Sequence, residues 1–146
     1  MFNLVKTFQA MEQEQGNQQP HLIAIADRAI EIAKAFENQQ LSTQQTLEQL
    51  EDLIRRYREG ESSPERKELE GAYVVYWLLN EQGNEKAIDV ARASKAAFEE
   101  RPHWHHSEEQ ERQVRIELYK AMWKADVYDM FTFADKLLDV LRRARE

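Results

Sequence analysis

The sequence predicts an all-α protein that folds as a compact bundle of about six or seven helices. Only four glycines and three prolines interrupt the 146 residues. Apolar residues recur at intervals of three and four along most of the chain, which is the period of an amphipathic helix. The chain is also rich in helix formers such as Ala, Glu, Gln, Leu and Arg, and it has few β-branched runs. Together these observations favour helices throughout.

Residues 1–20 are predicted to form an N-terminal linker helix and a loop, and residues 21–146 a single helical domain. The linker helix is indicated by an amphipathic pattern made of Phe2, Leu4, Val5, Phe8 and Met11. The Gln-rich stretch QEQGNQQP, with a glycine and a proline, then reads as a loop. From about His21 to Asn38 the apolar residues again recur at three and four, which predicts the first helix of the domain.

The next two helices are bounded by recognisable capping residues. Ser42 is the predicted N-cap of a Leu-rich helix, with a glutamine three residues later in the capping-box position, and Gly60 is expected to end that helix. Ser63 followed by Pro64 then has the pattern of an N-cap with proline at the first helical position. The helix continues through 69–79, the most apolar stretch; a strand is disfavoured there because no second strand is predicted to pair with it.

The stretch 102–124 is predicted to carry the central helix of the bundle, after a helix at 87–98. Ser107 and Gln110 have the capping-box spacing. Two adjacent sides of this helix are apolar, one made of Val114, Leu118, Ala121, Met122 and Ala125 and the other of Ile116, Tyr119 and Trp123. Since more than half of the circumference is apolar, we expect neighbours on both sides. A last helix, from Met130, follows a turn at 126–129.

Composition and motifs exclude several classes of chemistry. The chain has no cysteine, which excludes disulfides, iron–sulfur clusters, thiolate zinc sites and cysteine nucleophiles. It contains no glycine-rich phosphate loop, no GxSxG motif and no HExxH motif, so we expect neither catalysis by this chain alone nor a cofactor. The net charge of −7 argues against nucleic acid as the main partner.

The expected location is the cytoplasm. The N-terminal segment MFNLVKTFQAMEQEQ lacks the uninterrupted apolar run of a signal peptide. The sequence also contains no apolar segment of the length that crosses a bilayer. Both features predict that the chain is neither secreted nor inserted in a membrane.

The turn with His103, His105 and His106 around Trp104 is the one cluster that suggests a metal. Closely spaced imidazoles can bind zinc or nickel when carboxylates such as Glu108 help. The alternative is a polar turn between two helices in which the tryptophan is a hydrophobic plug. We favour the plug, because zinc sites normally hold their ligands at helix spacing or on turns built by cysteines. No metal is therefore expected.

The candidate partner-binding residues are aromatic and basic side chains, namely Tyr73, Trp77, Arg115, Trp123, Arg142 and Arg143. Most of the aromatic residues are expected in the core, and some in an exposed docking patch. Arg115 lies between the two apolar sides of its helix. It either extends past Tyr119 to solvent, pairs with an acidic residue between helices, or anchors a partner protein. The terminal arginines also suit the negative end of the last helix dipole.

Three segments carry a resemblance to a known family: IADRAIEIAKAFENQQLSTQQTLEQLEDLIRRY, AYVVYWLLNEQG and PHWHHSEEQERQVRIELYKAMWKA. From about Ile23 to Arg143 the chain resembles the C-terminal helical domain of the restriction (R) subunit of type I restriction–modification enzymes. It departs from the family at Glu70-Gly71, where the glycine is expected earlier, in a longer loop. In the family a nuclease and an ATP-driven DNA translocase precede this domain, and their catalytic motifs are absent from this sequence.

The resemblance implies a non-catalytic assembly domain that docks the translocase and nuclease onto the methyltransferase (modification) core, for the restriction of foreign DNA in phage defence. The implied partners are the modification subunits. A rival hypothesis is direct contact with duplex DNA through basic helix ends, that is Arg112, Lys120 and Lys124 or Arg142, Arg143 and Arg145. A third is a metal- or ligand-binding bundle that uses the histidine turn.

Overall fold

The computed structural model describes residues 2–145, except for the side chain of Phe2, and every regular element in this part of the chain is helical. The elements are α1 (Phe2–Gln15), α2 (Pro20–Glu37), α3 (Thr43–Glu61), α4 (Pro64–Leu69), the 3-10 turn η1 (Glu70–Ala72), α5 (Tyr73–Glu81), α6 (Ala87–Glu100), α7 (Glu108–Lys124) and α8 (Met130–Arg145). The all-α prediction is confirmed. The sequence predicts about six or seven helices. The structure agrees with this number when α4, η1 and α5 are counted together, because they take the place of one predicted helix.

That predicted helix is interrupted at Glu70. The residue has a φ of 52° and a ψ of −120°, a backbone conformation that residues with a Cβ rarely adopt. The chain therefore leaves the α4 axis there, passes through η1 and begins α5 at Tyr73. The start of α4 is as predicted, since Pro64 is its first residue and the Ser63 hydroxyl accepts the backbone N–H of Arg66 at 3.2 Å.

The predicted caps are formed to different degrees. At α3, Ser42 and Gln45 complete the capping box, with N···O distances of 3.1 and 2.9 Å. At α7, the Ser107 hydroxyl accepts the N–H of Gln110 at 3.2 Å. The Gln110 side chain, however, accepts the backbone N–H of His103 at 2.9 Å and not that of Ser107. The second predicted capping box is therefore only half formed, because the histidine turn competes for the glutamine.

Gly60 does not end α3, which continues to Glu61. Instead, a Cβ at this position would collide with the hydroxyl group of Tyr73. The glycine is thus explained by the close approach of α5 to the last turn of α3. The prediction that it stops the helix is wrong by one residue, and it also missed the reason for the glycine.

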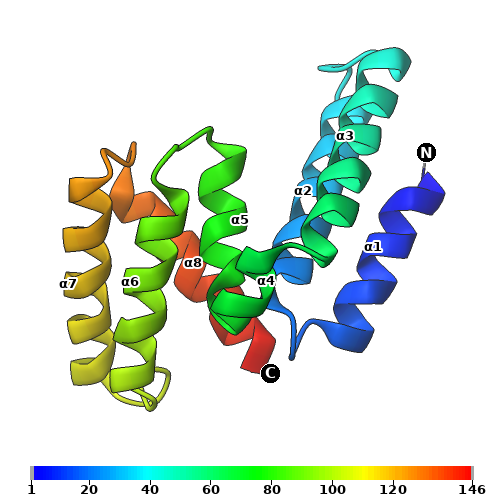
Figure 1. Cartoon of the computed structure of the whole chain (residues 1–146). Coiled ribbons are helices and arrows are strands. Elements are labelled where there is room, and N and C mark those ends of the chain that lie inside the picture. The colour runs from blue at the N-terminus through cyan, green and yellow to red at the C-terminus, as the bar shows by residue number, and fades with distance from the viewer. Residues whose placement is uncertain (1, 146) are drawn as a thin grey trace.

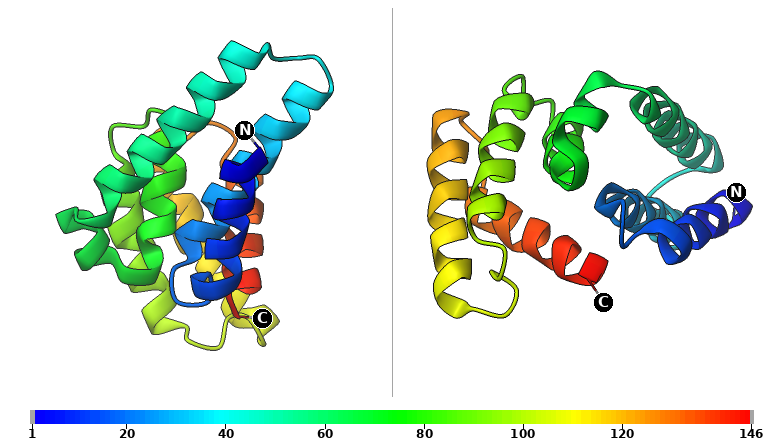
Figure 2. Two further views of the ribbon diagram at one scale, coloured as in Figure 1. Left: turned by 90° about the vertical axis from the view of Figure 1, so that its right-hand side faces the viewer. Right: turned by 60° about the horizontal axis from the view of Figure 1, so that its bottom comes forward.

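The central helix is α2, and the prediction that 108–124 holds this position is wrong. α2 packs against α1, α3, α5 and α8, and Figure 1 shows it behind α3 near the middle of the molecule. All seven residues from Pro20 to Ala26 are buried, so every side of its first two turns is covered. By contrast, α7 lies at one end of the molecule, next to α6 (Figures 1 and 2).

Buried residues from every α-helix belong to one hydrophobic cluster. α1 contributes Val5 and Phe8, which pack along α2. α8 runs beneath the other helices and contacts both α2 and α7 (Figure 2).

The predicted boundary near residue 20, between the linker segment and the helical domain, stays a prediction. Among residues 2–145, no helix has the length and apolar character needed to cross a bilayer.

Candidate docking surface

Large apolar side chains are exposed together on α7 and at the start of α8. The exposed fractions are 45% for Ile116, 75% for Trp123, 88% for Tyr128 and 59% for Phe131. Tyr119 lies half-buried beside them, its ring edge-on to that of Phe131 with the centroids 5.0 Å apart. We call these five residues the α7–α8 face. Among the side chains that the structure describes, the other exposed large apolar residue is Leu47, on α3.

The face follows from helix geometry and from one tight turn. Ile116, Tyr119 and Trp123 are three and seven residues apart and therefore share one side of α7. The opposite apolar side, which contains Val114, Leu118 and Met122, is buried against α6 and α8. Asp126 and Asp129 adopt positive φ values of 54° and 49°, so the chain reverses quickly after α7. This reversal brings Phe131 against Tyr119.

Arg115 fixes the seam between α7 and α8. Its guanidinium donates to Asp135 Oδ1 at 2.7 Å and to the hydroxyl of Tyr119 at 3.4 Å. Glu111, one turn earlier on α7, accepts from the same side chain at 3.5 Å. Of the three alternatives for Arg115, the structure thus supports the ion pair between helices. The pairing also holds Tyr119 in place beside Phe131.

Cations accompany the face along α7. Arg112, Lys120 and Lys124 are exposed and stand four residues apart in line with Ile116. Glu117 is the single acidic residue between Arg112 and Lys124, and it lies 3.5 Å from the Lys120 ammonium group. This part of α7 is therefore basic, although the whole chain carries a net charge of −7.

Tyr73 and Trp77, two of the candidate partner-binding residues, are buried in the interior. The Tyr73 ring packs edge-on against His21, with the centroids 5.0 Å apart. The guanidinium of Arg56 lies over the Trp77 ring at 5.2 Å. Both aromatic rings thus pack between helices, and the structure does not bring them together with Trp123.

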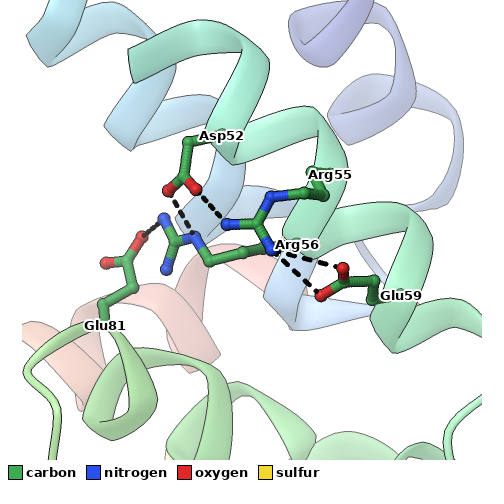
Figure 3. A network of polar contacts seen from close by, with 5 residues as sticks. All are labelled: Asp52, Arg55, Arg56, Glu59 and Glu81. Carbon is green, nitrogen blue, oxygen red and sulfur yellow. Dashed lines mark hydrogen bonds and ion pairs between the residues drawn. The ribbon is translucent and has the colours of Figure 1, made fainter. Parts of the chain in front are cut away.

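Arg56 belongs to a network that ties α3 to α5 (Figure 3). It reaches Glu81 at 3.1 Å and Asp52 at 3.2 Å. The neighbouring Arg55 pairs with Asp52 and, at 3.2 Å, with Glu59. Because Glu81 is the last residue of α5, the network holds α3 against the end of that helix, and it keeps the Arg56 guanidinium over the Trp77 ring.

Arg142 and Arg143 bind acidic residues of the chain itself. Arg142 lies 2.6 Å from Glu111 and 5.2 Å from the centre of the Trp104 ring, and so joins α8 to α7. Arg143 donates to both carboxylate oxygens of Asp27, at 2.7 and 2.9 Å, and to Glu12 at 3.2 Å. The hydrogen bonds that the guanidinium donates to Asp27 raise the pKa of Arg143. These two arginines connect helices.

The histidine turn is built around Trp104, which is buried against Phe98 with the ring centroids 5.4 Å apart. This supports the hydrophobic plug. The rings of His105 and His106 are 3.9 Å apart, and lost hydration, followed by the positive charge of Arg145, lowers the pKa of His105. Across the residues that the structure describes, no three His, Asp or Glu side chains are arranged to hold a metal ion.

Two features of the structure do not follow from the sequence pattern. The first is His21, a buried histidine at the start of α2, whose Nε2 lies 3.5 Å from Glu61. Burial, and after it the charge of Arg66, lowers the pKa of His21 to about 4. The available signal was a polar residue directly before the apolar stretch of 22–26. The imidazole is therefore neutral inside the protein at neutral pH.

The second is a cleft of about 480 Å³ where the α1–α2 turn, η1, the end of α6, the histidine turn and the end of α8 meet. Its floor is apolar and includes Leu69, Phe98 and Trp104. Its rim carries charges of both signs, and one of them, Lys95, already donates to the carbonyl of Glu68 at 2.7 Å. Sequence periodicity could not reveal a cleft that five separate segments assemble.

Comparison with family models, curated proteins and solved structures gives no match to this chain in any of the three. The resemblance to the R-subunit domain therefore stays a prediction. The geometry of the α7–α8 face is the main guide to function.

Proposed function

We propose that this chain is a non-catalytic assembly module that docks on another protein through the α7–α8 face. The observation that carries the proposal is the exposure of Trp123, Tyr128 and Phe131 in one region, while the other tryptophans are buried. Grouped apolar side chains of this kind on a surface mark interaction sites. Tryptophan and tyrosine also supply much of the binding energy at protein interfaces.

In its specific form, the proposal is that the module belongs to a type I restriction endonuclease R subunit. It would hold the DNA translocase and nuclease on the methyltransferase core, in the cytoplasm. The support for this form is the sequence resemblance over residues 23–143, together with a surface suited to docking. The face itself can serve a different protein partner, so the two levels of the proposal are tested separately.

The test is size-exclusion co-elution of this chain with the methyltransferase subunits from the same genome, with and without duplex DNA. We expect the wild-type chain to co-elute without DNA or ATP. The double variant Trp123→Ala/Phe131→Ala should elute alone, because it lacks two of the exposed aromatic anchors of the face. Leu47→Ala is the matched control, since it removes an exposed apolar side chain from α3. Separate elution of the wild-type chain would reject the methyltransferase as the partner.

A second candidate is direct contact with duplex DNA. It is favoured by the exposed row of Arg112, Lys120 and Lys124, and weakened because Arg142 and Arg143 already form ion pairs with acidic residues of the same chain. Phosphate contacts release counterions, so such binding would fall steeply as salt increases. Migration with duplex DNA alone at low salt, without the methyltransferase, would favour this candidate over protein docking.

A further inference from the structure

We infer that the α7–α8 face receives an amphipathic helix of the partner protein, with an apolar stripe that covers Ile116 and Trp123 and an acidic edge beside Lys120 and Lys124. The inference rests on the proposed function, because it assumes that the face is a docking surface. It adds the shape and charge of the occupant.

The shape of the face matches a helix. Ile116 and Trp123 are seven residues apart on one helix side, which is about 10 Å at the usual rise of about 1.5 Å per residue. Anchors spaced over two turns are the contacts that an amphipathic helix makes with an apolar surface. Tyr119 and Lys120 are consecutive, so they point about 100° apart and flank this line on opposite sides.

The two borders of the line differ in chemistry. On the Tyr119 side, the ring of Phe131 from α8 extends the apolar surface. On the other side stand the ammonium groups of Lys120 and Lys124, whereas Arg112, four residues before Ile116, lies about 40° towards the Tyr119 side. Complementary charge across an interface sets orientation and partner choice. A helix with carboxylates along the edge beside Lys120 and Lys124 therefore fits the α7 part of this face better than a basic helix, while the exposed Asp126 and Asp129 lie beyond the end of α7.

Two other occupants fit less well. A second copy of this chain, paired through the same face, would bring the two sets of cations close together and add a second net charge of −7. Single-stranded nucleic acid stacks its bases on free aromatic faces. Here Tyr119 and Phe131 contact each other edge-on, and one end of the face is the aliphatic Ile116.

The test uses the full chain and two synthetic helical peptides without aromatic residues. Both peptides carry the same leucine stripe, one flanked by glutamates and the other by lysines. Trp123 is the exposed tryptophan while Trp77 and Trp104 are buried, so fluorescence reports on the face. We expect the acidic peptide to bind at least tenfold more tightly than the basic one and to shift the emission to shorter wavelength. Trp123→Phe should abolish that shift.

Charge reversal sharpens the test. The variant Arg112→Glu/Lys120→Glu/Lys124→Glu should invert the preference between the two peptides. The matched control, Lys6→Glu/Lys34→Glu/Lys67→Glu, changes three exposed lysines on α1, α2 and α4 by the same total charge and should keep the wild-type preference. Far-ultraviolet circular dichroism and unfolding curves for both variants verify that they are folded.

Several results would overturn the inference: equal affinity for both peptides, no binding of the acidic peptide, self-association of the chain through Trp123, or tighter binding of oligothymidylate. Failure of the proposed function gives a different pattern. If the acidic peptide binds as expected but the methyltransferase does not co-elute, the partner assignment fails and the inference stands. If the charge-reversed variant still co-elutes with the methyltransferase, the assembly role stands and the acidic helix is rejected.

Discussion

α2 and α7 both carry apolar residues around much of their circumference, yet only the first two turns of α2 are covered on all sides. Its residues from Pro20 to Ala26 are buried beneath four neighbouring helices. On α7, one apolar side packs against α6 and α8, while the side with Ile116 and Trp123 faces solvent. The apolar pattern of a helix shows how much of its surface can be buried. It does not show whether the same chain or another molecule buries that surface.

The same contrast appears in the two tryptophans that flank α7. Trp104, in the turn before the helix, is 2% exposed, and Trp123, in its last turn, is 75% exposed. Neighbouring helices account for the difference at Trp104, because Phe98 of α6 packs against its ring and the guanidinium of Arg142, near the end of α8, lies over the same ring at 5.2 Å. The second apolar side of α7 is left available to a partner.

The largest effect on stability should come from the buried tryptophan. Trp104→Ala removes an indole packed against Phe98 and Arg142 and should lower the free energy of unfolding by roughly 3–5 kcal/mol. Trp123→Ala should change it by less than about 0.5 kcal/mol, as for an exposed residue. Urea unfolding of the two variants provides the comparison. Equal losses would mean that Trp123 is part of the core.

The isoleucines give a matched pair on the two helices. Ile25 is fully buried on α2, so Ile25→Ala should cost roughly 2–5 kcal/mol of unfolding free energy. Ile116→Ala, on the outer side of α7, should cost less than about 1 kcal/mol, because the side chain stays partly in water in the folded state. Thermal unfolding monitored by circular dichroism measures both. If Ile116→Ala lowered the free energy of unfolding as much as Ile25→Ala, the outer side of α7 would be as buried as α2, which would contradict this comparison.

The buried His21 makes the α2 end of the molecule sensitive to pH. Its pKa is lowered to about 4 in the folded protein from the ordinary value of 6.5, so the unfolded chain takes up a proton at higher pH than the folded one. The contribution of this group to stability is complete above pH 6.5 and is lost as the pH falls towards 4, by up to about 3 kcal/mol.

The measurement is the free energy of unfolding between pH 7.5 and pH 4 for the wild type and for His21→Asn. The difference between the two proteins isolates this histidine from the carboxylates that also titrate at low pH. We expect the wild type to lose more stability than the variant over this range. Parallel pH profiles would show that His21 is not the group responsible.

The smallest predicted difference in unfolding free energy is between substitutions of two arginines, Arg143 and Arg112. Arg143→Met breaks charged hydrogen bonds to Asp27 and Glu12 and should lower the free energy of unfolding by about 1–3 kcal/mol. Arg112→Met, on the exposed side of α7, should change it by less than about 0.5 kcal/mol. Chemical denaturation distinguishes them. A similar cost for both would indicate that Arg112 also has a structural role.

Local patterns predicted much of the fold. The Ser42 capping box, the Ser63-Pro64 start and the α7 boundary all depend on residues close in sequence, and the structure contains each of these helix starts. The central helix was assigned incorrectly because that position depends on how helices distant in sequence pack. The same limitation applies to Tyr73 and Trp77: their aromatic character suggested binding, and only the packing of α3 and α5 shows that they are buried.

The exposed site was only partly predictable. Trp123 was named from its helical spacing and is part of the α7–α8 face, whereas Tyr128 and Phe131 join it through the reversal at Asp126 and Asp129. Arg142 and Arg143 looked available for a partner because their acidic contacts, Glu111 and Asp27, are distant in the sequence. Ion pairs of this kind follow from the fold and not from local spacing.

Hydroxyl-radical footprinting of the chain, alone and with the methyltransferase subunits, tests the central claim most directly. The account predicts that Trp123 and Phe131 are oxidised rapidly in the free chain and protected in the complex, while Leu47 on α3 reacts equally in both. A complex that co-elutes but leaves Trp123 and Phe131 as reactive as in the free chain would contradict the assignment of the α7–α8 face as the docking surface.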